Sequence, residues 1–247
     1  MPDKNNLIEK FVKSHINDIG ILGILLCGSY SYGNSTPNSD VDIRIIYSDE
    51  IKINEKRVQI IDKIVFSSFL RNESSYINLM NNQFQNISKF EARNISTCKV
   101  LYSTDSNKVN RILELAKNIM KIEFSTLSKK RIDILKYSLW NHYTKICNLP
   151  EKSLLFAYNY YILANRILSI YGNILGFEYV LEDKIEDYLT SKDFREMYYM
   201  QDIPDKKFKK LFLITVTNMQ KENIINLYEH VEKQVGKLNL NNLIIAH

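Results

Sequence analysis

The sequence predicts an α/β (α+β) fold, in which a mixed sheet with flanking helices is followed by an all-α helical bundle. The apolar run from Ile21 to Cys27 and the alternating pattern from Val41 to Ile46 predict strands in the first half. From Asn107 onward, apolar residues recur at the three- and four-residue spacing that is typical of amphipathic helices. We therefore expect two domains, residues 1–120 and 121–247.

The elements are expected in the following order along the chain. A short amphipathic helix precedes the first strand, and a Gly-Ser turn after that strand leads into a short helix. The expected elements are the helix Leu7 to Asn17 and the strands Ile21 to Cys27, Asp40 to Ile46, Arg57 to Phe66 and, at an edge, Lys99 to Tyr102. The later helices are expected at 129–146, 152–171, 181–189 and 206–235, with breaks at Pro150, Gly172, Gly176 and Pro204.

Composition excludes few functions. The chain of 247 residues is 45% hydrophobic, which is enough for a large core, and its net charge of +5 is spread along the sequence. A dense basic stripe, as in a dedicated nucleic-acid binder, is absent from the sequence. The three cysteines are too far apart for a metal or disulfide pattern. We find neither a signal peptide nor an apolar run of the ~20 residues needed to span a bilayer, so we expect a cytoplasmic protein with no membrane partner.

Two aspartates at the start of the second strand are the strongest chemical signal. Asp40 and Asp42 alternate with Val41 and Ile43, so the two carboxylates share one face of the strand. Holding two carboxylates together is unfavourable unless a cation lies between them. Mg²⁺ typically takes one or two carboxylate ligands and completes its octahedron with water and phosphate oxygens. The pair therefore predicts a Mg²⁺ site.

A phosphate-binding turn is expected beside this pair. Gly28 lets the backbone approach phosphate oxygens closely, and Ser29 offers a hydroxyl and a backbone N–H. Taken alone, a Gly-Ser turn or an Asp-x-Asp is commonly a turn or a solvated strand end. Here both fall in order within the 26 residues from Ile21 to Ile46, which favours a site for a nucleoside triphosphate over coincidence.

These residues resemble the signature of the nucleotidyltransferases of the DNA polymerase beta superfamily. The match comprises Gly28-Ser29, Gly33 and Ser39-Asp40-Val41-Asp42, and it is specific over residues 21 to 66. The resemblance implies the nucleotidyltransferase fold, with Gly28, Ser29 and Ser39 at the triphosphate and Asp40 and Asp42 as ligands of two Mg²⁺ ions. It also implies transfer of a nucleoside monophosphate from a nucleoside triphosphate, for which we expect ATP.

Members of this superfamily usually add a third carboxylate from a nearby strand, and Asp62 is the candidate. If Arg57 to Phe66 is one strand, Asp62 shares a face with apolar Ile60 and Ile64, where a carboxylate needs compensation. We expect it to be the third metal ligand and a candidate base for the acceptor hydroxyl. The alternative is an ion pair with Lys63 or Arg57, which would lie on the opposite face.

Arg44 shares the face of Asp40 and Asp42 and leaves two interpretations open. Its guanidinium could brace the aspartates or meet a phosphate bidentately, so we count it among the nucleotide-site residues. It could equally reach solvent at the end of the strand.

The second half offers weaker signals about the acceptor. The stretch Tyr161 to Leu168 with Gly172 loosely resembles a helix of the aminoglycoside adenylyltransferases. That implies an acceptor-binding helical domain and transfer of AMP to a small hydroxylated molecule such as an aminoglycoside or lincosamide antibiotic. Aromatic residues from Trp140 to Tyr161 could line a pocket, although helical spacing is more typical of core, and His142 is interpreted as a surface or capping residue.

Three functions remain open from the sequence. The first is the small-molecule enzyme. The second is a toxin that modifies tRNA or protein, which makes nucleic acid a possible but unfavoured partner. The third is a catalytically silent nucleotide-binding regulator, against which the costly set of Asp40, Asp42 and Asp62 argues. The acceptor and the oligomeric state are not determined by the sequence.

Overall fold

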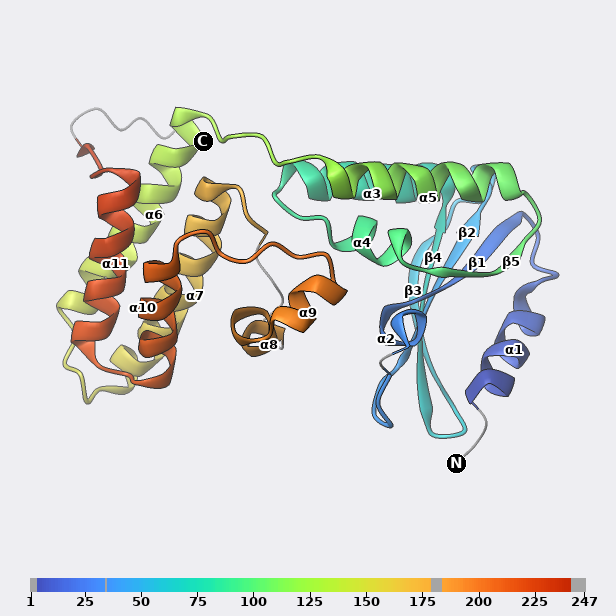
Figure 1. Cartoon of the computed structure of the whole chain (residues 1–247), viewed down its shortest axis with the longest axis horizontal. Helices are drawn as coiled ribbons and strands as arrows, with labels where there is room; N and C mark the ends of the chain where they lie inside the picture. Colours follow the sequence, from blue (N-terminus) through green and yellow to red (C-terminus); the bar gives the residue numbers. More distant parts are fainter. Residues whose placement is uncertain (1–3, 34, 179–183, 241–247) are drawn as a thin grey trace. The chain divides into compact units, whose positions relative to one another are not determined.

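A computed structural model describes residues 4–33, 35–178 and 184–240. The chain divides into two compact units, Met1–Ile122 and Glu123–His247. The first unit contains the sheet, and the described part of the second consists of helices and loops (Figure 1).

The first unit is built on a five-stranded sheet in the order β3-β4-β2-β1-β5. Strands β2 and β4 pair in parallel and the other neighbours are antiparallel, so the sheet is mixed, as expected. The strands are β1 (Ile21–Cys27), β2 (Val41–Tyr47), β3 (Asn54–Ile61), β4 (Ile64–Asn72) and β5 (Lys99–Ser103). The expected edge position of β5 is confirmed.

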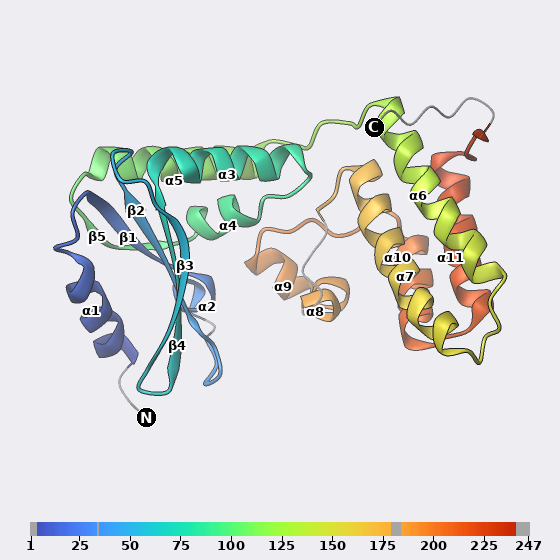
Figure 2. The same cartoon turned by 180° about the vertical axis from the view of Figure 1, so that it is seen from behind.

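Helices cover the two faces of the sheet unequally (Figures 1 and 2). The helix α1 (Lys4–His15) packs Leu7 and Phe11 against Val41, Ile43 and Phe66 on one face. The opposite face packs on three helices, which are α3 (Glu73–Gln85), α4 (Phe90–Ser96) and α5 (Ser106–Lys121). A short helix, α2 (Gly28–Tyr32), follows β1 directly. The Asp42 side of β2 therefore belongs to the α3–α5 face.

The expected single strand from Arg57 to Phe66 is wrong. Strand β3 ends at Ile61 and β4 begins at Ile64, and the two pair as a hairpin. The two residues between them, Asp62 and Lys63, have φ values of 48° and 69°. Positive φ at both central residues is the signature of a type I′ turn, whose twist suits a two-residue hairpin. Asp62 therefore lies in a turn and not on a strand face.

The second unit contains six described helices around its own apolar core. They are α6 (Lys129–Cys147), α7 (Leu154–Leu175), α8 (Ile185–Thr190), α9 (Lys192–Met197), α10 (Lys206–Thr217) and α11 (Lys221–Val235). Residues 181–183 of the expected helix at 181–189 lie outside the described residues. Fully buried side chains of α7, among them Phe156, Tyr160 and Leu163, form the centre of this core.

Two expected boundaries in this unit differ from the structure. The helix expected at 206–235 is two helices, since α10 ends at Thr217 and α11 begins at Lys221. The buried hydroxyl of Tyr160 donates to the carbonyl oxygens of Thr215 and Asn218, which stabilises this break. Gly172 does not end α7, because the left-handed Gly176 caps it instead.

Of the helices that the structure describes, none has the length and apolarity to cross a membrane.

Candidate active site

Four residues form a transverse row across the sheet beside the start of β2. Cys27 pairs with Asp42, Asp42 with Ser67, and Ser67 with Val58. Paired residues on neighbouring strands project to the same face at a spacing of about 4.8 Å. The row therefore places the Asp42 carboxylate between the end of β1 and the hairpin of β3 and β4.

Gly28 lies in close contact with the Asp42 carboxylate. Its φ is +63°, and a Cβ built on it would lie 2.5 Å from Oδ2 of Asp42. Only glycine accommodates both the left-handed backbone and the approaching oxygen. The expected neighbourhood of the Gly-Ser turn and the Asp-x-Asp pair is thus present in the structure.

Asp40 and Ser29 are the more accessible members of the site. Asp40 immediately precedes β2 and is exposed, and Ser29 in α2 is half-buried. Ser39 closes the turn before β2, because its Oγ accepts a hydrogen bond of 2.8 Å from the Thr36 amide and its own N–H donates to the Thr36 carbonyl at 3.1 Å. The structure therefore gives Ser39 a role in shaping the approach to Asp40.

Arg44 is buried and does not reach solvent, so the solvent-exposed alternative is wrong. Its side chain is 2% exposed, with Nε 2.7 Å and one terminal nitrogen 3.3 Å from the two carboxylate oxygens of Glu91. The other terminal nitrogen is 3.8 Å from Oδ1 of Asp42, and the guanidinium carbon lies 4.1 Å from the ring centroid of Phe69. These contacts hold a positive charge behind Asp42.

The electrostatics of the site follow from this burial. Burial raises the pKa of the Asp42 carboxyl, the Arg44 guanidinium opposes that rise, and the Asp40 carboxylate reinforces it. Burial alone would lower the pKa of Arg44, but the Glu91 carboxylate outweighs it and the pKa is raised. Arg44 is therefore a fixed cation. Glu91 has no signal in the sequence, because it is 47 residues from its partner and looks like an ordinary helical glutamate.

A pair of thiols lies behind Asp42. Continuing the register of β1 and β5 places Cys98 opposite Cys27, and both side chains pack in the same apolar cluster. Burial and a hydrogen bond with Cys98 raise the pKa of the Cys27 thiol well above its ordinary value. Cys27 is thus an inert member of the core.

Asp62 does not join the other two aspartates, which corrects the expected three-carboxylate site. Ser67 of β4 is the neighbour of Asp42, and it lies about 10 Å from the first residue of the strand, Ile64, at ~3.3 Å per residue. Asp62 precedes Ile64 and is therefore farther still from Asp42. The position beside Asp42 on β4 is occupied by Ser67. Among the described residues, no three His, Cys, Asp or Glu side chains gather closely enough to hold a metal ion.

The residues that are present still fit a divalent cation. Asp40 and Asp42 supply hard oxygen ligands, and the charge of Asp40 is felt at Asp42. Two carboxylates match the protein share of a Mg²⁺ site that takes its other ligands from phosphates and water.

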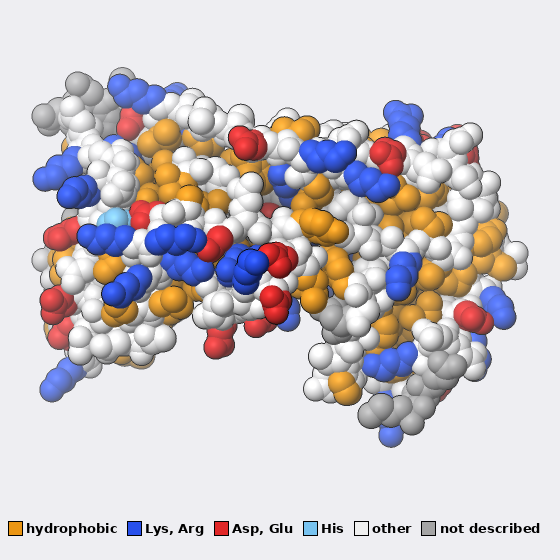
Figure 3. Space-filling view, in the orientation of Figure 1, with side chains coloured by type: hydrophobic (Ala, Val, Ile, Leu, Met, Phe, Trp, Pro, Cys, Tyr) orange, Lys and Arg blue, Asp and Glu red, His pale blue; other side chains and the backbone are white. Residues whose placement is uncertain are grey.

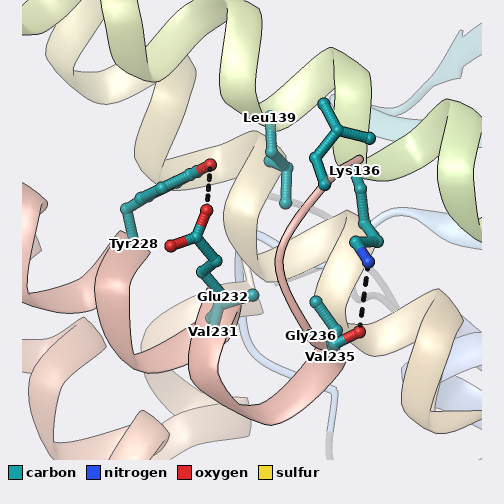
Figure 4. Close-up of a pocket in the computed structure, with 8 residues that line it drawn as sticks. Lys136, Leu139, Tyr228, Val231, Glu232, Val235 and Gly236 are labelled. Carbon is teal, nitrogen blue, oxygen red and sulfur yellow. Dashed lines mark hydrogen bonds between the residues drawn. The ribbon is translucent and has the colours of Figure 1, made fainter. Parts of the chain in front are cut away.

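Two cavities among the described residues of the second unit differ greatly in size. One lies between α6 and α11, measures about 10 Å³ and has room for about one water. Lys136, which lines it, donates a hydrogen bond of 3.4 Å to the Val235 carbonyl (Figure 4). The other measures about 470 Å³ and is lined mainly by apolar side chains of α7, α8 and α10, with Tyr161 and Glu186 among them. Of these two, the larger cavity has the volume of a small-molecule site.

His142 and Tyr143 of the second unit make contacts with other residues of its helices. The Nδ1 atom of His142 lies 3.1 Å from the Ser138 carbonyl, and burial lowers the pKa of the ring. Tyr143 stacks on Tyr228 with ring centroids 3.8 Å apart. These contacts are consistent with a structural role. Tyr161 lines the larger cavity together with Phe212.

Comparison with known proteins identifies the same region. Residues 6–82 match the model of the nucleotidyltransferase domain, which covers α1, the row around Asp42 and the β3–β4 hairpin. Among solved structures, the chain is similar to a nucleotidyltransferase-like protein from Exiguobacterium sibiricum 255-15, at 10% identity and a TM-score of 0.41, over 95% of this chain and 77% of that one. No curated protein matches. Residues 6–82 of the first unit are thus similar to a nucleotidyltransferase domain.

Proposed function

We propose that the protein is a Mg²⁺-dependent nucleotidyltransferase that moves a nucleoside monophosphate, AMP from ATP, to a hydroxyl of a small molecule. The observation that supports it best is the contact of the Asp42 carboxylate with the Gly28 backbone. That contact joins a metal-ligating side chain to a turn that can receive phosphate oxygens.

Each residue has a distinct task in this proposal. Asp40 and Asp42 would hold Mg²⁺, which neutralises charge on the phosphate oxygens and orients them for in-line displacement. The backbone at Gly28 and Ser29 would donate to the triphosphate. Arg44, fixed by Glu91, lies behind Asp42 and opposes the rise in its pKa that burial causes. Positioning and charge neutralisation supply most of the catalysis in such transfers.

The acceptor is the least defined partner. We propose that the helical unit, residues 121–247, contributes to acceptor binding and that an aminoglycoside- or lincosamide-type antibiotic is the first class to test. The supporting feature is the cavity of about 470 Å³ lined by α7, α8 and α10.

A catalytically silent nucleotide-binding module is the second candidate. The observation that favours it is that Ser67 stands beside Asp42 on β4, whereas the expected third carboxylate, Asp62, lies in the β3–β4 turn. Two aspartates suffice to bind a metal-bound nucleotide, whereas transfer also requires activation of an acceptor.

A macromolecular acceptor has less support. On the face shown in Figure 3, Lys and Arg side chains form a band over the second unit, and Asp and Glu side chains border it. Two lysines of α10, Lys206 and Lys209, are already paired with Asp202, at 2.5 and 2.8 Å. A phosphate backbone binds best where several cations are unpaired.

The test is a transfer assay with Mg²⁺ and each α-³²P-labelled nucleoside triphosphate. The acceptors are a panel of aminoglycosides, lincosamides, bulk tRNA and cell protein. Asp40→Asn and Asp42→Asn should remain folded and lose transfer, while Asp62→Asn serves as the matched control and should keep it. Label on RNA or protein would favour the macromolecular acceptor. Mg²⁺-dependent nucleotide binding without transfer to any acceptor would favour the silent module, and full activity of Asp42→Asn would overturn the metal assignment.

A further inference from the structure

Three aliphatic side chains form an exposed surface beside the candidate site. Val58, Ile60 and Val65 are 59%, 74% and 37% exposed. Val58 pairs with Ser67 and Ile60 with Val65, so all three lie on the Asp42 face of the sheet. We call this set the β3–β4 apolar surface.

Such exposure is unusual for this sheet. On the opposite face of β4, Ile64 and Phe66 are buried against the α1 layer. A strand with one solvated face normally alternates apolar inward and polar outward residues. Here the outward face of the hairpin is apolar as well, and contiguous exposed apolar residues are a feature of interaction sites.

The direction of the reaction places the acceptor over this surface. This step rests on the proposed function. In an in-line displacement the attacking and leaving oxygens lie on opposite sides of the α-phosphorus. Gly28 and Ser29, which would hold the leaving pyrophosphate, follow β1 on one side of Asp42. The acceptor therefore approaches from the other side, over β4 and β3.

The dimensions agree with a small acceptor. Val58 is two strands away from Asp42 in the same transverse row, which corresponds to about 10 Å at ~4.8 Å per strand. A molecule of one or two rings spans that distance.

We propose that the acceptor packs an apolar face on the β3–β4 apolar surface while its hydroxyl reaches the α-phosphorus above Asp42. The hydroxyl oxygen bonds to the α-phosphorus, the bond to the bridging oxygen breaks, pyrophosphate leaves and the hydroxyl proton passes to water. Lys56 lies on the same face, with its Nζ 5.1 Å from the ring centroid of Phe69.

The test compares two probes that differ by one apolar ring, methyl β-D-glucopyranoside and phenyl β-D-glucopyranoside. The full chain, methyl-labelled at Ile and Val, is saturated with Mg²⁺ and a non-hydrolysable ATP analogue and titrated with each probe by NMR. We expect the methyl signals of Val58, Ile60 and Val65 to shift with the phenyl compound, which should bind roughly tenfold more tightly than the methyl compound.

Two variants test whether the preference for the phenyl probe depends on the β3–β4 apolar surface. Val58→Thr with Ile60→Thr keeps β-branched side chains on an exposed strand and should abolish the preference for the phenyl probe. Val100→Thr changes an exposed valine, 46% accessible, on β5 of the same sheet and should leave it intact.

The outcomes separate this proposal from the one on which it rests. If the ATP analogue causes no Mg²⁺-dependent shift of the methyl signals of Val41, which lies between Asp40 and Asp42, the proposed function itself fails. If the nucleotide binds and both glucosides bind equally, only the acceptor inference is overturned. A dimer in sedimentation that the Val58→Thr, Ile60→Thr variant converts to monomer would also overturn it, because the surface would then join two copies of the chain.

Discussion

Glu91 holds the guanidinium of Arg44 at 2.7 Å inside the first unit, and both side chains are nearly inaccessible to solvent. Breaking a buried pair leaves one charge without compensation, so Glu91→Ala should lower the free energy of unfolding by about 3–5 kcal/mol. Urea denaturation measures this loss. The double variant Arg44→Met, Glu91→Met should recover most of the stability, since apolar replacement of a whole pair is often neutral. Equal loss in the single and double variants would contradict the pairing.

Gly28→Ala should abolish Mg²⁺-dependent nucleotide binding, because the added Cβ would displace the Asp42 carboxylate. Gly33→Ala is the matched control. It carries a similar left-handed strain, with φ +78°, but a Cβ there has nothing within 4 Å. Both variants should lose about 1 kcal/mol of stability from backbone strain, and only Gly28→Ala should lose binding in calorimetry. A similar loss of binding in the Gly33→Ala protein would point to strain and not to the contact with Asp42.

Asp42→Asn should raise the melting temperature at neutral pH. Burial raises the pKa of Asp42 in the folded protein, so the contribution of this group to stability is complete below its unfolded pKa and is lost as pH rises through the folded pKa. The amide mimics the protonated form at every pH. Melting curves of both proteins should therefore converge below the ordinary aspartate pKa of about 3.9.

Added Mg²⁺ and nucleotide should reverse this order at neutral pH. Ligands that bind only the folded state stabilise it by mass action, and only the wild-type protein retains both metal-ligating carboxylates. An Asp42→Asn protein that is less stable than wild type at neutral pH without ligand would contradict the direction of the pKa shift.

Residues that favour positive φ in the β3–β4 turn should raise the stability of the protein. Asp62→Asn with Lys63→Gly places the preferred type I′ pair at φ 48° and 69° and should stabilise the protein by roughly 0.5–1 kcal/mol. Thermal melts test this gain. Asp62→Asn with Lys63→Ala removes the same charges but keeps a side chain at φ 69° and should show no comparable gain. A loss of stability in the glycine variant would argue against the turn.

Much of the site could be predicted from the sequence because its strongest signals are local. The continuous apolar run of β1, the glycine after it and the alternation around Asp42 each report on neighbouring residues. The structure brings Gly28 and Asp42 into contact as these signals suggested.

The errors at Asp62 and the absence of Glu91 from the predicted site have separate physical causes. Asp-Lys is an uncommon pair for a type I′ turn, so the sequence gives no clear turn signal there. The alternation of Val58 and Ile60 also continues through Ile64 and Phe66, so the two strands of the hairpin have the pattern of one long strand. The structure shows that the two pairs of residues face opposite sides of the sheet. Glu91 is brought to Arg44 only by tertiary folding, which no local pattern reports.

The position of β5 has a consequence for how little of the chain can fold alone. All residues of β1 are buried, and β1 receives one of its two partners, β5, only after α3 and α4 have been added. A fragment that stopped at residue 82, where the matched domain model ends, would leave the backbone donors and acceptors of that apolar strand unpaired. Such a fragment should self-associate, and the smallest independently folding piece should extend through α5.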